Sequence, residues 1–388
     1  MTFLNPVLTK TVVIGAALSL LSCHERTSRP ILSLAFKINY NVQPLENPDD
    51  YQKLLKALDG FLRTKNQSST DNPFWLQSDF EKYHRPYEPI MFVENNDKVG
   101  DSNFFKPTLL NIVGTNKEDE LILKLAFMGQ DSTGLSDLRA IYNIVAVRKD
   151  NDYKFKSIFE RNLSSWNIKT IGTITYVYKD TLNIDLAEKM DSFSKDFAKK
   201  FNVDPIPLTY YKCKDPVDLF RLKGFDYTPT MYIDTTGGRG EPWHNALFAA
   251  NNSEWYPREI VGFYLVRVFG SDVNFIIREG YQTYLGGTAG RSLDEVLKTT
   301  SAFYQAHPER DVLKDLVESY RIHGNLYLAY PLGGLVFRIT DERLGFEGIN
   351  RLFRIGRGDD GFSKAVDSVL GVGDEELSSF LRKEVTKY

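Results

Sequence analysis

The stretch that decides the fold is SEWYPREIVGFYLVRVFGSDVNFIIREGYQTYLGGTAG, residues 253–290. Within it, residues 257–269 are apolar apart from Arg258, Glu259 and Arg267. This pattern predicts a buried helix that begins with a proline in its first turn. A carboxylate inside such a helix needs a partner, because an unpaired buried charge is costly.

A second helix is predicted over residues 272–285, where the pair Gly286 and Gly287 provides a stop signal. It also carries a carboxylate, Glu279, among apolar residues. The sequence therefore predicts two consecutive helices, each with one glutamate on an apolar background.

These helices resemble the motif helices of the gluzincin metallopeptidases, in which the first reads H-E-x-x-H and the second supplies a glutamate as third zinc ligand. In bacterial envelope proteins of this type, the first helix reads Y-P-H-E-I-V-H and the second E-G-x-x-T-Y-L-G-G. The corresponding segments here are YPREIVG, residues 256–262, and EGYQTYLGG, residues 279–287. The resemblance covers residues 200–345, and its specific residues lie within 253–290.

The match fails at the two histidine ligands, which are Arg258 and Gly262 in this chain. A guanidinium has no lone pair for a metal, and glycine has no side chain. Glu279 alone cannot hold zinc, and without zinc no activated water stands beside Glu259. The resemblance therefore implies a gluzincin-like scaffold without zinc or any other cofactor, in which these four positions are relics and no catalytic residue is expected.

The same substitution suggests what replaces the ion. If the helices pack as the resemblance implies, the Arg258 guanidinium enters the former metal cavity and faces Glu279, with Glu259 nearby. We therefore expect an ion pair between Arg258 and Glu279, with the charged atoms within about 4 Å of each other.

Three further residues are candidates for the lining of the cleft: His244, Tyr256 and Tyr284. His244 could be a metal ligand recruited late, but one imidazole with Glu279 falls short of the three protein ligands of a catalytic zinc site. We expect a structural or cleft-lining role for it.

The composition is that of an ordinary globular protein. The chain has 388 residues, 42% of them hydrophobic, with a net charge of −3. This length allows two domains, and the absence of a basic excess makes nucleic acid a poor candidate partner.

The first 22 residues have the pattern of an export signal, a short lead followed by an apolar run that is too short to span a membrane. The sequence Leu-Leu-Ser-Cys that ends at Cys23 resembles the lipobox of bacterial lipoproteins. It implies a lipid on Cys23, a tether over residues 23–30 and attachment to the cell envelope, with the outer membrane as the expected site. The alternative is a signal peptide cleaved elsewhere without lipid. A lipidated Cys23 leaves Cys213 without a disulfide partner.

Residues 31–180 are predicted to form an α+β domain with one curved antiparallel sheet, preceded by a helix over residues 49–63. The expected strands are residues 32–38, 90–93, 108–113, 121–127, 140–147, 153–159 and 170–178.

Residues 181–388 are predicted to form the gluzincin-like domain, a small sheet followed by a mainly helical part. A helix is expected over residues 185–201, and the glycine-rich residues 235–241 are interpreted as a hairpin turn. The expected strands are residues 208–213, 227–233 and 246–249, and the further helices are residues 216–222, 292–306, 311–320, 326–344, 346–355, 362–370 and 375–387.

Three classes of function remain open. The first is a catalytically inactive metallopeptidase-like lipoprotein that binds a peptide or protein partner, or serves as a structural element. The second is an active zinc peptidase with a non-standard metal site. The third is an assembly or ligand-binding module that acts through the N-terminal sheet.

Overall fold

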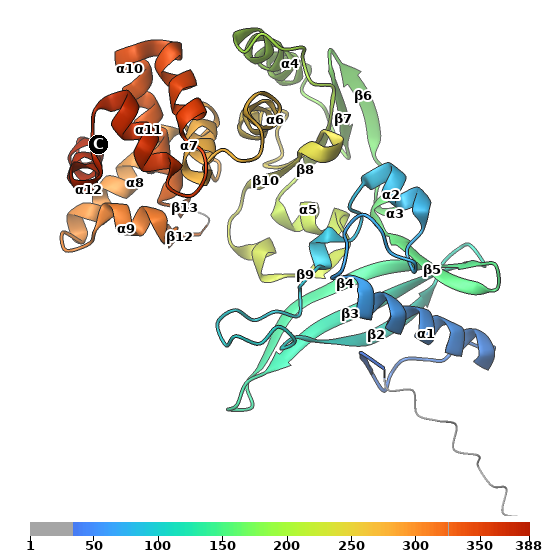
Figure 1. The fold of residues 1–388 in the computed structure, drawn as a ribbon. Helices are drawn as coiled ribbons and strands as arrows, with labels where there is room; N and C mark the ends of the chain where they lie inside the picture. Colours follow the sequence, from blue (N-terminus) through green and yellow to red (C-terminus); the bar gives the residue numbers. More distant parts are fainter. Residues whose placement is uncertain (1–33, 325) are drawn as a thin grey trace, which may run out of the picture. The chain divides into compact units, whose positions relative to one another are not determined.

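The computed structural model describes residues 34–324 and 326–388. The predicted signal peptide, the lipidation site Cys23 and the tether lie outside these residues. Ala35–Tyr388 form one compact unit that combines helices and sheets, which confirms the α+β class. Figure 1 shows its elements in chain order.

The first sheet contains six strands in the order β1-β2-β3-β4-β5, with β9 paired to β4. The β1–β2 pair is parallel and the others are antiparallel. Helix α1 (Pro48–Thr64) is capped by the Asn47 side chain and buries Leu54, Leu58 and Phe61. The strands are β1 (Lys37–Ile38), β2 (Lys106–Gly114), β3 (Glu120–Gln130), β4 (Ser136–Lys149), β5 (Asp152–Ser157) and β9 (Phe225–Tyr227).

The second sheet has five strands in the order β10-β11-β8-β7-β6. The prediction of a single N-terminal sheet was wrong here, because β7 pairs in parallel with β8 rather than with the first sheet. The expected boundary at residue 180 therefore runs through this sheet, and β9 from beyond it joins the first. The strands are β6 (Asn167–Ile171), β7 (Ile174–Tyr178), β8 (Leu208–Cys213), β10 (Gly237–Glu241) and β11 (Ala246–Ala250).

Helices cover both faces of the second sheet. Because side chains alternate along a strand, Tyr210 on one face joins the core with helices α4 (Ile184–Lys200) and α6 (Pro257–Phe269). Phe248 on the other face packs with Leu219 of helix α5 (Pro216–Leu222). Helix α6 thus lies directly on the sheet.

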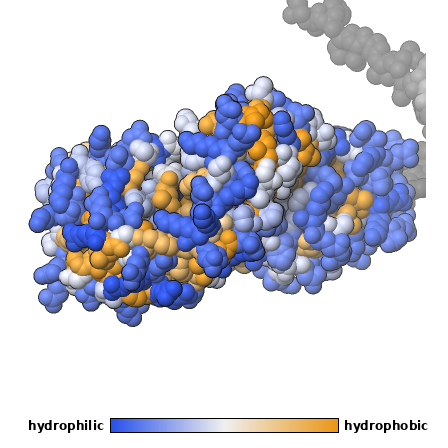
Figure 2. All heavy atoms as spheres, turned by 90° about the horizontal axis from the view of Figure 1, so that it is seen from above, coloured by the Kyte–Doolittle hydropathy of each residue, from blue (hydrophilic) through white to orange (hydrophobic). Residues whose placement is uncertain are grey.

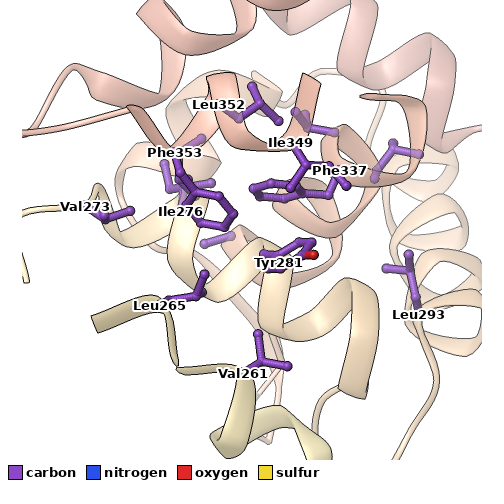
Figure 3. Packing of buried hydrophobic residues seen from close by; sticks show 14 of the residues in the cluster. Val261, Leu265, Val273, Ile276, Tyr281, Leu293, Phe337, Ile349, Leu352 and Phe353 are labelled. Carbon is purple, nitrogen blue, oxygen red and sulfur yellow. The ribbon is translucent and has the colours of Figure 1, made fainter. Parts of the chain in front are cut away.

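The C-terminal part is helical and packs around α7 (Phe275–Gly286) and α10 (Ala329–Ile355). Figure 3 shows Tyr281 of α7 beside Phe337 and Phe353 of α10 in the core of this part. The two helices cross so closely that a Cβ atom on Gly280 would lie 2.5 Å from the carbonyl carbon of Gly333. The other helices are α8 (Leu293–Ala306), α9 (Val312–Val317), α11 (Gly361–Leu370) and α12 (Asp374–Val385), beside the hairpin β12 (Arg321–His323) and β13 (Leu326–Tyr327).

Several local predictions were wrong, and each error has a physical reason. Ile90 lies in a short helix rather than a strand, because Pro89 fixes a helical φ at its start. Pro229 likewise ends the strand expected over residues 227–233 and begins a short helix. The short helices are α2 (Gln77–Tyr83), α3 (Phe159–Asn162), η1 (Glu88–Ile90), η2 (Pro229–Tyr232) and η3 (Pro242–His244).

The most informative error concerns residues 235–241, which were predicted as a turn. Residues 237–241 form β10, the edge strand of the second sheet, antiparallel to β11. Its glycines are needed because aromatic rings lie against them: a Cβ atom on Gly238 would lie 2.3 Å from Tyr256, and one on Gly240 would lie 2.6 Å from Phe263. Close contact with α6 thus requires glycine in this strand.

One face of the molecule shows how polar and apolar residues are distributed. Figure 2 shows one face on which hydrophilic and hydrophobic residues are interspersed. Scattered apolar residues are normal on a protein surface.

Candidate functional site

Helices α6 and α7 follow each other through a short reversal, and the sequence accounts for both ends. Gly270 ends α6 with a φ of 85°, a conformation that glycine adopts without strain. Asn274 then caps α7, where its side chain accepts a hydrogen bond of 2.9 Å from the Ile276 N–H. The two helices pack against each other, as the sequence predicted.

Arg258 of α6 is almost fully buried, with 6% of its surface exposed. Its Nη2 atom lies 2.5 Å from Oε2 of Glu279 on α7. Its Nη1 atom donates to the Thr283 hydroxyl at 2.8 Å and to the Gly287 carbonyl at 3.1 Å. The predicted ion pair between α6 and α7 is therefore present, and the guanidinium is fixed by neutral acceptors as well.

The ring of Tyr330, on α10, lies under the same guanidinium, with its centroid 4.8 Å from the Arg258 Cζ atom. Burial tends to lower the pKa of Arg258, but the charges of Glu279 and Glu259 outweigh it and raise this pKa. Arg258 is consequently a permanent cation in this site.

Glu279 also accepts hydrogen bonds from side chains of its own helix. Its Oε1 atom lies 3.2 Å from Nε of Arg278 and 3.5 Å from Nε2 of Gln282. Both carboxylate oxygens are thus engaged by protein side chains.

Glu259 lies between α6 and the edge strand. Its Oε2 atom accepts a hydrogen bond of 3.0 Å from the Gly240 N–H of β10, and its Oε1 atom lies 3.9 Å from Nε of Arg258. Burial, assisted by the negative charge of Glu279, raises the pKa of Glu259 above its ordinary value of 4.5, although Arg258 opposes the shift. The residue that the resemblance equates with a general base is therefore tied to the backbone.

Gly262 stands where the resembled motif has its second histidine. The space beside it is filled by a side chain of the neighbouring helix α7. A Cβ atom on Gly262 would lie 2.9 Å from Oε1 of Gln282. The amide of Gln282 therefore occupies the side of α6 where an imidazole at position 262 would begin.

These residues do not fit a zinc ion of the kind that the gluzincins hold between the two corresponding helices. A metal requires several lone-pair donors around one point, whereas Glu279 here faces the Arg258 guanidinium, which has none. Among residues 34–324 and 326–388, no group of three or more His, Cys, Asp or Glu side chains is placed to hold a metal ion.

The ion pair lines a cleft of about 350 Å³. Residues 236–239, at the start of β10, form one wall, and Tyr327 and Tyr330 contribute aromatic rings to the lining. Arg258, Glu259, Glu279 and Tyr256 all line this cleft. Three of the four relic positions, together with Tyr256, are thus brought together in one cleft.

Two of the predicted cleft residues are placed elsewhere. Tyr284 donates to Asp341 Oδ2 at 2.7 Å and lines an adjoining cavity of about 370 Å³, which shares Tyr256 and Arg258 with the cleft. Burial raises its pKa to about 12. His244 lies in η3 and lines a third cavity, at the far end of β10.

Sequence reasoning missed Gln282, Thr283 and Tyr330 as members of the site. Gln282 and Thr283 lie three and four residues after Glu279, on the same helical face. That spacing was a usable signal for both. No such signal exists in the sequence for Tyr330, because only the fold brings α10 next to α6.

A comparison of the chain with protein families, with curated proteins and with solved structures finds no match. Within the part of the chain that the structure describes, no helix has the length and apolar character required to cross a membrane.

Proposed function

We propose that this protein is a catalytically inactive, gluzincin-like lipoprotein of the bacterial cell envelope whose cleft binds an extended peptide segment. The proposal draws on the sequence resemblance of residues 256–262 and 279–287. It is supported by the packing of α6 on a sheet, by the adjacent α7 and by an edge strand along the cleft.

One observation carries the inactive assignment: the 2.5 Å contact between Arg258 Nη2 and Glu279 Oε2. In the resembled peptidases the corresponding glutamate binds zinc, and the ion joins the two helices. Here a protein cation makes that connection, and it supplies no Lewis acid for a water molecule. Glu259 then lacks an activated nucleophile to deprotonate.

The edge strand supports the binding role. The N–H of Gly240 points away from β11, to Glu259. Backbone groups two residues apart on a strand point the same way, so those of Gly238 also face away from β11, at the cleft wall. An extended peptide could add to this edge through main-chain hydrogen bonds, with Tyr327 and Tyr330 contacting its side chains.

Metal analysis together with peptidase assays tests the inactive assignment. The purified protein, after equilibration with zinc and dialysis, should contain far less than one zinc per chain and should hydrolyse no peptide from a mixed pool. Near-stoichiometric zinc that a chelator removes together with a peptidase activity would overturn the proposal.

Binding of labelled peptides from a mixed pool tests the cleft. The Tyr327→Ala substitution removes a ring from the cleft lining and should weaken peptide binding about tenfold. The matched control is Tyr40→Ala, because Tyr40 is 92% exposed and lies outside the cleft. Equal affinity of the Tyr327→Ala variant and the wild type would count against peptide binding in this cleft.

Lipid attachment at Cys23 is tested by labelling with palmitate in a bacterial host. The wild-type chain should incorporate the label and sediment with membranes. The Cys23→Ala variant should do neither, and a labelled Cys23→Ala chain would exclude this residue as the lipidation site.

A further inference from the structure

The cleft beside β10 reaches both faces of the second sheet. On one face it is lined by Arg258 and Glu259 of α6, and on the other by Pro216, Leu219 and Phe220 of α5. The first group is charged, whereas the second is apolar throughout. The two sides of the cleft therefore offer different chemistry to a peptide that lies along the edge strand.

The cleft extends toward α5 because the strands carry small residues there. Gly237 of β10 pairs with Ala250 of β11, and Ala250 belongs to the core on the α5 face. Both residues line the cleft. The next pair on that face, Arg239 with Phe248, carries two large side chains. The Gly237–Ala250 pair thus contributes a single methyl group, which leaves a hollow beneath α5.

The two faces differ in how much room they leave beside the strand. A Cβ atom on Gly237 would lie 3.9 Å from Cγ of Pro216, which is an ordinary van der Waals contact. A Cβ atom on Gly238, which points to the α6 face, would lie only 2.3 Å from Tyr256. The α5 face can therefore admit a further apolar group at Gly237, whereas the α6 face is filled at Gly238.

The α5 face offers no free charge to a ligand. Among the described residues that line the cleft on this face, only Arg239 is charged. Its guanidinium contacts Glu88 and Glu241, each at 3.4 Å. A charged side chain that entered the hollow would lose water without gaining a partner, which is unfavourable.

A strand added to the edge of β10 would direct its side chains to the two faces in alternation. A residue in register with Gly237 points, like Gly237, to the α5 face. Its side chain would then enter the hollow beneath α5, where each methylene group removed from water contributes to affinity.

We infer, on the basis of the proposed peptide binding, that the segment bound in this cleft carries an apolar side chain of about leucine size. This side chain lies between Gly237, Ala250 and helix α5. Main-chain hydrogen bonds to the edge strand hold a segment of any sequence, so the side chains select among segments. The cleft therefore prefers extended segments with a leucine-like residue at the position that faces α5.

Binding of three sets of labelled heptapeptides to the purified protein tests this inference. The outer positions of every set are drawn from serine, threonine and glutamine, and the central residue is leucine, alanine or glutamate. Fluorescence anisotropy should show that the leucine set binds about tenfold more tightly than either of the other sets. This comparison uses the wild type alone and does not depend on the folding of a variant.

The Gly237→Val variant fills the hollow from within, because its Cβ atom has room beside Pro216. It should bind the leucine and alanine sets with equal affinity. The matched control is Gly114→Val, because Gly114 is also a strand glycine and nothing lies within 4 Å of its Cβ position. The control should retain the preference for leucine.

The outcomes separate this inference from the proposed function. Equal affinity of the wild type for the three sets would overturn the leucine preference and leave peptide binding in the cleft intact. A Gly237→Val variant with an undiminished preference would show that the apolar side chain binds elsewhere, which would also overturn the inference. Binding of no set would contradict peptide binding itself and the preference with it.

Discussion

A Cβ atom placed on Gly262 would lie 2.9 Å from the Oε1 atom of Gln282 on the neighbouring helix. The loss of an imidazole at this position is therefore matched by a side chain that fills its space. Together with the Arg258–Glu279 pair, this contact means that neither histidine position can hold a ligand and that Gln282 also fills the space beside Gly262.

Because Gln282 fills this space, restoring zinc binding requires a substitution at Gln282 in addition to the two histidines. The double variant Arg258→His/Gly262→His should bind zinc weakly, because Gln282 competes for the space of the second imidazole. Addition of Gln282→Ala should raise the zinc content to about one ion per chain by metal analysis, since two histidines and Glu279 then provide three ligands.

The control for this experiment adds Glu279→Gln to the triple variant, which removes the third ligand and should abolish tight binding. A folded triple variant that takes up no zinc would show that the resemblance does not extend to a metal position.

Removal of the buried cation alone should be costly. Arg258→Met leaves Glu279, whose side chain is only 14% exposed, without its main partner. We expect a loss of about 3 kcal/mol in the free energy of unfolding at pH 7, measured with urea. The double variant Arg258→Met/Glu279→Gln should recover more than half of this loss. Additive effects of the two substitutions would contradict a direct ion pair.

The surface pair of Lys364 and Asp360 provides a control for this cycle, because both side chains are at least 65% exposed. Lys364→Met should change the unfolding free energy very little, since solvent screens such pairs.

Stability should depend on pH through Glu259. Burial raises its pKa in the folded state above the ordinary value of 4.5. The protonated form is therefore favoured by folding, and this contribution is lost as the pH rises from 4.5 through the raised pKa. Glu259→Gln retains an acceptor for the Gly240 N–H and removes the titration.

The Glu259→Gln variant should match the wild type below pH 4.5 and become progressively more stable than the wild type above it, in thermal unfolding at a series of pH values. Glu347→Gln, at an exposed position, should show no such divergence. A difference that stays constant with pH would argue against a raised pKa.

The site also depends on the close crossing of α7 and α10. Gly280→Ala would place a Cβ atom 2.5 Å from the Gly333 carbonyl carbon, so the helices must separate. We expect a loss of about 2 kcal/mol in unfolding free energy. Gly114→Ala is the control, because nothing lies within 4 Å of its Cβ position. Equal stability of the two variants would show that the crossing relaxes freely.

Local sequence determined the helices of the site. The range 257–269 was predicted and is the observed α6, because a proline fixes its start and Gly270 reverses the chain at its end. The ion pair between Arg258 and Glu279 also followed from the sequence, once the two helices were taken as neighbours. Separate helices were predicted over residues 326–344 and 346–355, and Gly345 interrupts α10 between them with a φ of 59°.

Tertiary structure alone decided how the strands pair and what surrounds the ion pair. The sequence of β7 is equally suitable for either sheet, and its parallel partner β8 is fixed by packing against α4 and α6. The strand β10 has no hydrophobic alternation, because its glycines admit the rings of Tyr256 and Phe263. Strand pairing and the contact of aromatic rings with glycines both join residues that lie far apart in the chain, so local sequence does not determine them. The sequence therefore determined which charges the site contains, and the fold determined that Gln282 and Tyr330 enclose them.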